Sequence, residues 1–230
     1  LEQAQQGART GWRGRRGAAC VVALVVVSGS AAGDALLIGP RPYREASDSP
    51  FWELKGLMLD TLEDGQLNLA GVVPHGGFVL GPTANTDSVD ADDGVIDGNG
   101  RGGHSWWISE KSLEVRFDEA VLGQFPTRVG LVWTDGRDVV TFEAYGPDGE
   151  LLGTLTGDHP DGVSGGGTDE DRFYGVRNGE GVSRIIFRNS GPWAGIEVDH
   201  FQYILPAPGG AILIAAAGMV GGLCRRRLGV

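Results

Sequence analysis

Six side chains with metal-binding oxygens crowd into the segment TDSVDADDGVIDGNG (residues 86–100): Asp87, Asp90, Asp92, Asp93, Asp97 and Asn99. Ca²⁺ takes about six to eight oxygen ligands, and a loop rich in Asp and Gly can supply them. The spacing is not that of an EF-hand, because Gly94 stands where a third ligand belongs and no Glu closes the loop. Asp and Gly are also typical of ordinary surface turns. A structural calcium site and a plain acidic turn therefore both remain open.

Two further acids, Glu197 and Asp199, lie in the stretch GIEVDHFQY (residues 195–203). The alternation of a strand predicts that both acids lie on one face with Phe201. Ile196, Val198 and His200 then lie on the opposite face. We expect the acids to be solvated, and we count them as additional candidate calcium ligands. The stretch is similar to the last strand of jelly-roll carbohydrate-binding modules, and that resemblance implies an acid that helps to hold Ca²⁺.

Tryptophans are the third group that could bind a ligand. Trp106 and Trp107 are adjacent in GHSWWIS, so on a strand one faces the core and the other faces outward. An outward tryptophan could stack on a sugar ring, and Trp193 could do the same. In VGLVWTDG, alternation places Trp133 on one face with Val129 and Leu131, which predicts that this tryptophan packs in the core.

Motifs for catalysis are missing from the sequence. The four histidines are scattered without an HExxH pattern, and the serine of GVSGGG lacks the strand-to-helix setting of a nucleophile elbow. Paired carboxylates of the glycosidase type are not excluded by a segment so rich in acids. The sequence therefore favours a protein that is not an enzyme.

The segment 33–203 predicts an all-β fold. Short runs rich in β-branched and aromatic residues are separated by glycine-rich turns, and several alternate between apolar and polar residues, as in SLEVRF (residues 112–117). YGPDGELLG (residues 145–153) is typical of a hairpin with its turn at Pro147–Gly149. About nine such strands predict a β-sandwich, more narrowly a jelly roll.

Residues 1–32 have the three parts of a secretory signal peptide. Arginines precede ten apolar residues (18–27), and small residues then offer a cleavage site after Ala32. Ten residues are too few to cross a bilayer, which needs about 20.

Residues 204–230 predict a sorting signal. Pro206, Ala207 and Pro208 precede an apolar run, and the run is followed by an arginine cluster at residues 225–227, Arg225, Arg226 and Arg227. Residues 204–224 are long enough for one membrane-spanning helix, and the arginines would stay in the cytoplasm. The order resembles the PEP-CTERM signals of exported bacterial proteins, with Ala207 in place of Glu. That resemblance implies processing by an exosortase-like enzyme. A sortase is the alternative, because LPAPG (residues 205–209) is a degenerate form of its signal.

Charge limits the partners of the chain. The net charge is −11, and segment 33–205 holds 29 acidic and 12 basic residues, so electrostatic repulsion argues against nucleic acid as a partner. Both cysteines lie outside this segment, so its fold depends on a hydrophobic core. Residues 85–203 also look like the β-domains of many PEP-CTERM proteins, chiefly in VGLVWTDG and GIEVDH, and that resemblance implies an extracellular domain.

Three functions follow as expectations. The first is an exported, membrane-tethered or surface-sorted β-domain of the envelope or extracellular matrix that is not an enzyme. The second is a calcium-dependent carbohydrate-binding module at the cell surface. The third is a polysaccharide hydrolase or lyase, which would require two carboxylates that face one cleft.

Overall fold

The computed structural model describes residues 35–207, except 92–93, 100, 161, 164–165, 168 and 193–194. The expected signal peptide and all of the expected sorting signal beyond Ala207 lie outside the described residues. Twelve strands and one short helix, α1 (Glu119–Leu122), are found in the described part, so the prediction of an all-β fold is confirmed. None of the helices described there is long and apolar enough to cross a membrane.

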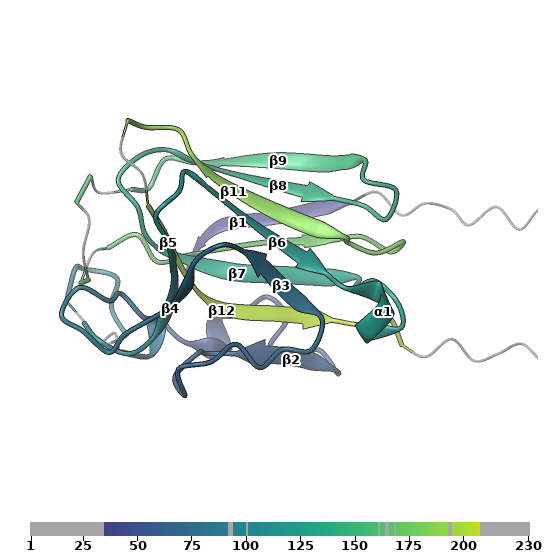
Figure 1. Cartoon of the computed structure of the whole chain (residues 1–230), viewed down its shortest axis with the longest axis horizontal. Coiled ribbons are helices and arrows are strands. Elements are labelled where there is room, and N and C mark those ends of the chain that lie inside the picture. The colour runs from purple at the N-terminus through teal and green to yellow at the C-terminus, as the bar shows by residue number, and fades with distance from the viewer. Residues whose placement is uncertain are drawn as a thin grey trace, which may run out of the picture. The chain divides into compact units, whose positions relative to one another are not determined.

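The strands form two antiparallel sheets that lie face to face as a β-sandwich (Figure 1). The larger sheet has the order β1 (Leu36–Pro42), β10 (Arg172–Arg177), β7 (Arg128–Asp135), β12 (Ile196–Ile204), β5 (Ser105–Ile108) and β4 (Phe78–Leu80), and β2 (Leu57–Asp60) also pairs with β12. The smaller sheet has the order β3 (Val72–His75), β6 (Ser112–Phe117), β11 (Arg184–Asn189), β8 (Val140–Tyr145) and β9 (Leu151–Gly157).

The last eight strands pair in a nested way. The β8–β9 hairpin is the innermost pair, and it is followed outward by β7 with β10, β6 with β11, and β5 with β12. The turn of the β8–β9 hairpin is the one predicted from the sequence, and its Gly149 has a φ of 80°. The nested order brings β12, the last strand, to the middle of the larger sheet.

The main core lies between the sheets. Val129, Leu131 and Trp133 of β7 all point into it, as their alternation predicted, and the Trp133 ring lies 5.7 Å from that of Phe187 on β11. SLEVRF likewise buries its alternate residues as β6. The sequence pattern therefore identifies these inner faces correctly.

A second, smaller core covers the outer face of the larger sheet. Tyr43, Phe51 and Val89 come from the connecting segments and pack on residues of the sheet that include Val132 and Phe173. Two short 3₁₀ turns, Ala46–Asp48 and Val89–Ala91, belong to these segments. Because β12 is covered on both faces, all nine of its residues are buried.

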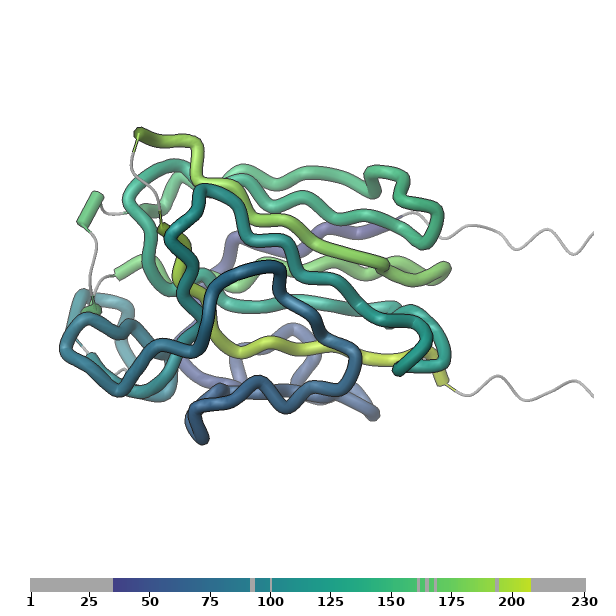
Figure 2. Tube along the Cα trace, in the orientation of Figure 1, coloured from purple at the N-terminus to yellow at the C-terminus, as the bar shows by residue number. Residues whose placement is uncertain are grey.

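The chain enters and leaves the sandwich at one end (Figure 2). Leu36 lies opposite Arg177, and Ile204 lies opposite Arg128, the residue that also pairs with Arg177. Asp135 at the far end of β7 is seven residues from Arg128, a distance of roughly 23 Å along a strand. Features near Asp135 therefore lie away from both ends of the described chain.

Candidate functional site

Four side chains form a row across neighbouring strands at this far end of the larger sheet. Phe78 of β4 is opposite Trp107 of β5, Trp107 is opposite Glu197 of β12, and Glu197 is opposite Asp135 of β7. Directly opposite residues have Cβ atoms about 5 Å apart and share a face of the sheet. We call Phe78, Trp107, Glu197 and Asp135 the aromatic–acid row.

The row lines an open pocket of about 610 Å³. The lining also includes five residues of the loops at this end, Thr83, Asn85, Gly136, Arg137 and Gly195, and two apolar residues, Leu80 and Ile196. A concave surface with aromatic walls and a few polar groups is the usual setting of a ligand site.

Glycine positions the aromatic half of the row. Gly77, just before β4, has a φ of 78°, and a Cβ there would lie 2.5 Å from Nε1 of Trp106 and 2.6 Å from the carbonyl oxygen of Trp107. The close approach lets Phe78 meet Trp107 edge to face, with 5.7 Å between ring centroids. Phe78 remains 53% exposed, so its ring is available to a ligand.

The acidic half of the row is buried. Glu197 is 2% exposed; its Oε1 accepts a hydrogen bond from the Ser105 hydroxyl and another, at 2.9 Å, from the backbone N–H of Asp87. Burial raises the pKa of Glu197 to about 8, and the charges of Asp135 and Asp87 act in the same direction. Glu197 is therefore largely protonated at neutral pH.

Next to the row on β12, a bulge changes which residues face outward. His200 has a φ of 48°, in the left-handed region, and the pairing with β7 shifts register between Asp199 and Gln202. Phe201 consequently joins the main core, whereas His200 points to the outer face with Glu197 and Asp199. The expectation that Phe201 would share the face of the acids was wrong, because strict alternation does not continue through a bulge.

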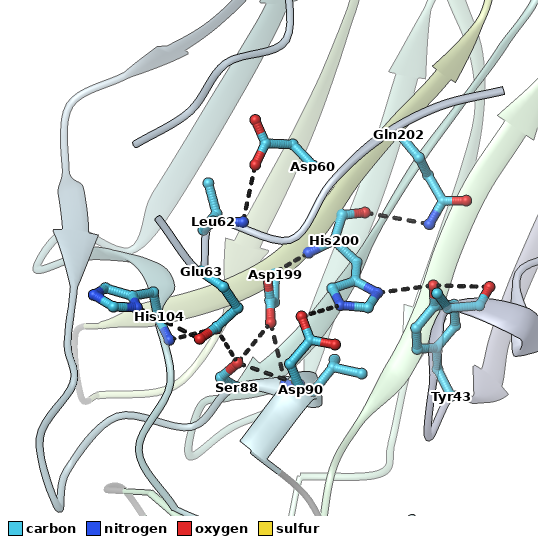
Figure 3. Close-up of polar contacts among 12 residues, drawn as sticks. Tyr43, Asp60, Leu62, Glu63, Ser88, Asp90, His104, Asp199, His200 and Gln202 are labelled. Carbon is cyan, nitrogen blue, oxygen red and sulfur yellow. Dashed lines mark hydrogen bonds and ion pairs between the residues drawn. The ribbon is translucent and has the colours of Figure 1, made fainter. Parts of the chain in front are cut away.

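His200 ties the covering segments to the sheet (Figure 3). Its Nδ1 lies 3.0 Å from the Tyr43 hydroxyl and its Nε2 lies 3.2 Å from Oδ2 of Asp90. Burial works to lower the pKa of His200, but the charges of Asp199 and Asp90 outweigh it and raise that pKa. Burial works to raise the pKa of Asp90, but the hydrogen bond and the charge of His200 lower it. Both directions favour an ion pair.

Asp199 anchors the same network from the strand. It is fully buried, and its Oδ2 lies 3.1 Å from both the Ser88 hydroxyl and the backbone N–H of Val89. Ser88 also contacts Glu63 at 2.9 Å, although a single hydroxyl hydrogen serves only one acceptor. Burial raises the pKa of Asp199 to about 7. Below about pH 7, where Asp199 is protonated, it can donate to Ser88 while Ser88 donates to Glu63, which satisfies both contacts; above that pH the ionised Asp199 stabilises the charged His200.

The predicted calcium ligands separate into different groups. The backbone N–H of Asp87 bonds to Glu197, whereas the side chain of Asp90 bonds to His200. Asp97 and Asn99 are exposed and hydrogen-bond to each other, and Asp92 and Asp93 lie outside the described residues. Within the described ranges, no three His, Cys, Asp or Glu side chains form a group that could hold a metal ion.

The expectation that Glu197 and Asp199 would be solvated was wrong, because the covering segments bury both.

The predicted stacking residues also divide. Trp106 packs on the main core, with its ring 6.2 Å from that of Phe201, and Trp107 lines the pocket, so the two do face opposite ways. Trp193 lies outside the described residues. Pro206 and Ala207 of the expected sorting signal follow β12 without regular structure, and the Pro206 carbonyl accepts a hydrogen bond from the side chain of Gln124.

Sequence reasoning missed Phe78 and Asp135 as members of a site. Each stands in a short apolar or turn-like stretch with no recognisable motif, and only strand register brings them beside Trp107 and Glu197. The glycine pair 76–77 before Phe78 was the one available signal of a close backbone approach.

The chain was compared with models of known protein families and with curated protein sequences. Neither a family model nor a curated protein sequence matches this chain.

Proposed function

We propose that the chain is an exported β-sandwich protein of the cell envelope or extracellular matrix that binds a glycan in this pocket and is not an enzyme. The observation that carries the proposal is the aromatic–acid row that lines the pocket. A sugar ring has an apolar C–H face, which suits Phe78 and Trp107, and hydroxyl groups, which suit Glu197, Asp135 and Asn85. With an inter-strand spacing of about 4.8 Å, the row spans roughly 14 Å, enough for more than one sugar unit.

The nested pairing of β5 to β12 supports the narrower assignment of a jelly roll. An antiparallel ribbon with β8 and β9 at its tip, folded over so that its strand pairs divide between two sheets, has that topology. We propose it as the architecture of the domain.

Export and tethering rest on the sequence signals in residues 1–32 and 204–230. In this proposal an exosortase-like enzyme processes the tail, and the membrane is reached through the C-terminal helix. The position of the pocket favours such a tether, because Asp135 lies at the end of β7 opposite Arg128 and Ile204. A protein held near Ile204 would present the pocket away from its attachment.

Calcium remains part of the proposal as a structural ion of the Asp-rich segment 86–100. Asp87 supports it, because this acid is buried within the electrostatic reach of Glu197. Buried acids are stabilised by a divalent cation in their neighbourhood. Calcium would then stabilise the loop that carries Asn85 and the covering segment.

A glycan-binding panel with the full chain tests the main proposal. We expect Trp107→Ala or Phe78→Ala to weaken binding of a retained glycan about tenfold, since each removes one ring from the contact surface. Trp52→Ala is the matched control, because Trp52 is 50% exposed and does not line the pocket. Binding of no glycan, or equal losses in all three variants, would reject the pocket.

A second candidate, a polysaccharide hydrolase, is favoured by one observation: Glu197 and Asp135 line the same pocket, and the pKa of Glu197 is raised to about 8. Such a carboxyl can serve as a general acid. We rank it second because Glu197 and Asp135 are direct neighbours on one face of the sheet, whereas the two carboxyls of a glycosidase flank the scissile bond. New reducing ends released by the wild type, but not by Glu197→Gln or Asp135→Asn, would reverse this ranking.

A further inference from the structure

Glu197 is a buried carboxyl with one oxygen left for a ligand. Both of its hydrogen bonds end on Oε1, while Oε2 has no hydrogen-bond partner among the described residues. Glu197 is only 2% exposed and yet lines the pocket. A carboxyl oxygen that lines a pocket and makes no hydrogen bond to the described residues is available to a ligand that brings a donor.

The electrostatics of this end of the pocket favour a cation. Asp135 lies directly across from Glu197, and Asp87 is close enough for its charge to act on the same carboxyl. Arg137 is the only cationic side chain among the described lining residues, and its Nε donates to the carbonyl of Gly162 at 3.1 Å. Once Glu197 is ionised, the lining carries two carboxylates and one guanidinium, so an ammonium that arrives beside Glu197 is favoured together with the loss of the Glu197 proton.

The aromatic end suits the same ligand. The faces of Trp107 and Phe78 attract both C–H groups and cations through the quadrupole of the rings. Trp107 and Glu197 are directly opposite neighbours, about 5 Å apart at Cβ, so one sugar unit can contact both. Two aromatic rings beside two acids therefore fit a ligand that has an apolar ring face and a positive group at the edge of that ring.

We propose that the pocket takes a sugar unit with a free amine, a hexosamine of a de-N-acetylated polysaccharide, with its ring on Trp107 and Phe78 and its ammonium between Glu197 Oε2 and Asp135. This inference rests on the proposed function and names the class of glycan. An N-acetylated hexosamine has the same ring but brings no charge to the acids. In the empty pocket the pKa of Glu197, raised to about 8 by burial, keeps this carboxyl protonated at pH 6. An arriving ammonium favours the ionised form, so binding releases close to one proton.

The experiment is titration calorimetry of the full chain at pH 6 with two oligosaccharides of equal length, one of glucosamine and one of N-acetylglucosamine. Each titration is repeated in two buffers of different ionisation enthalpy, which reports the protons released. We expect the amine form to bind about tenfold more tightly, as a hydrogen bond to a charged group provides, with nearly one proton released. Glu197→Gln should reduce the preference severalfold and abolish the proton release, whereas the exposed Glu53→Gln should change neither. Asp135→Asn is the second variant, in case Glu197→Gln does not fold.

The outcomes separate the two proposals. Equal or tighter binding of the N-acetylated oligomer overturns the inference, and so does a proton release that persists in Glu197→Gln. If the protein binds some other glycan but neither of these oligomers, the inference fails while the proposed function stands. If no glycan binds at all, both fail.

Discussion

Glu197 should make the protein lose stability as the pH rises from mild acid to mild alkali. The pKa of this carboxyl is 4.5 in the unfolded chain and about 8 in the folded protein, chiefly because it is buried. Between these values the folded state holds one proton more than the unfolded state, so the free energy of unfolding falls by about 1.4 kcal/mol per pH unit. The contribution is fully present below pH 4.5 and is lost as the pH rises through about 8. Over this interval it amounts to about 5 kcal/mol, a large share of the roughly 5–15 kcal/mol that stabilises a typical domain.

Other titratable groups near Glu197 change the stability with pH in the same direction. The pKa of Asp199 is raised to about 7 and that of His200 is also raised, so both add to the loss of stability at higher pH. The specific contribution of Glu197 must therefore be measured as a difference. Glu197→Gln keeps an acceptor for Ser105 and the Asp87 N–H but removes the titrating group, so its slope against pH should be flatter by about one proton.

Urea denaturation at pH 5, 6, 7 and 8, at constant ionic strength, measures these slopes for the wild type, Glu197→Gln and the exposed control Glu53→Gln. We expect the control to follow the wild type and Glu197→Gln to gain relative stability at pH 8. Parallel slopes for the wild type and Glu197→Gln, or a wild type that becomes more stable from pH 5 to 8, would refute the burial argument.

Three other changes test separate parts of the structure. Tyr43→Phe removes the hydroxyl 3.0 Å from Nδ1 of His200 and should lower the free energy of unfolding by about 1–3 kcal/mol, seen as a lower urea midpoint with an unchanged m-value; an unchanged midpoint would show that the network does not hold the cover. Gly77→Ala puts a Cβ within 2.6 Å of the Trp107 carbonyl oxygen and should separate β4 from β5, which we would measure as a weaker near-ultraviolet circular dichroism signal of the packed Phe78 and Trp107 rings. Gly94→Ala, whose Cβ would meet no described residue within 4 Å, shows the effect of replacing a left-handed glycine alone. Ca²⁺ at about 100 times its Kd should add about 2.7 kcal/mol to the free energy of unfolding, compared with the protein in a chelator. If the melting temperature is the same with Ca²⁺ and with the chelator, residues 86–100 form an ordinary acidic turn and not a calcium site.

Several strands were predictable because they have a local pattern, whereas β1 and β4 were not among those expected. Alternation identified β6 and β7, turn chemistry identified the β8–β9 hairpin, and the adjacent tryptophans of β5 were correctly placed on opposite faces. These features depend on neighbours in the chain, which a single sequence displays.

The environment of β12 was not predictable in the same way. Its acids appear solvated from alternation alone, because nothing in GIEVDHFQY shows that Tyr43, Phe51 and Val89 will cover that face. The bulge at His200 has no Gly or Pro to signal it. Both features are consequences of contacts more than 100 residues apart in the chain, such as the one between Asp90 and His200.

The candidate site was predictable only in part, for the same reason. Trp107 and Glu197 were chosen as ligand-binding residues from their chemical type, but in two unrelated roles. Their membership of one row with Phe78 and Asp135 follows from strand register, which is set by tertiary pairing. A single sequence does not show which of its strands will be neighbours.

The most direct test of the central claim is glycan binding by the full chain and by Trp107→Ala, with Trp52→Ala as the matched exposed tryptophan. We predict that the wild type and Trp52→Ala retain the same glycan with equal affinity and that Trp107→Ala loses about tenfold. A wild type that binds no glycan, or a Trp107→Ala variant that binds as tightly as Trp52→Ala, would contradict the account.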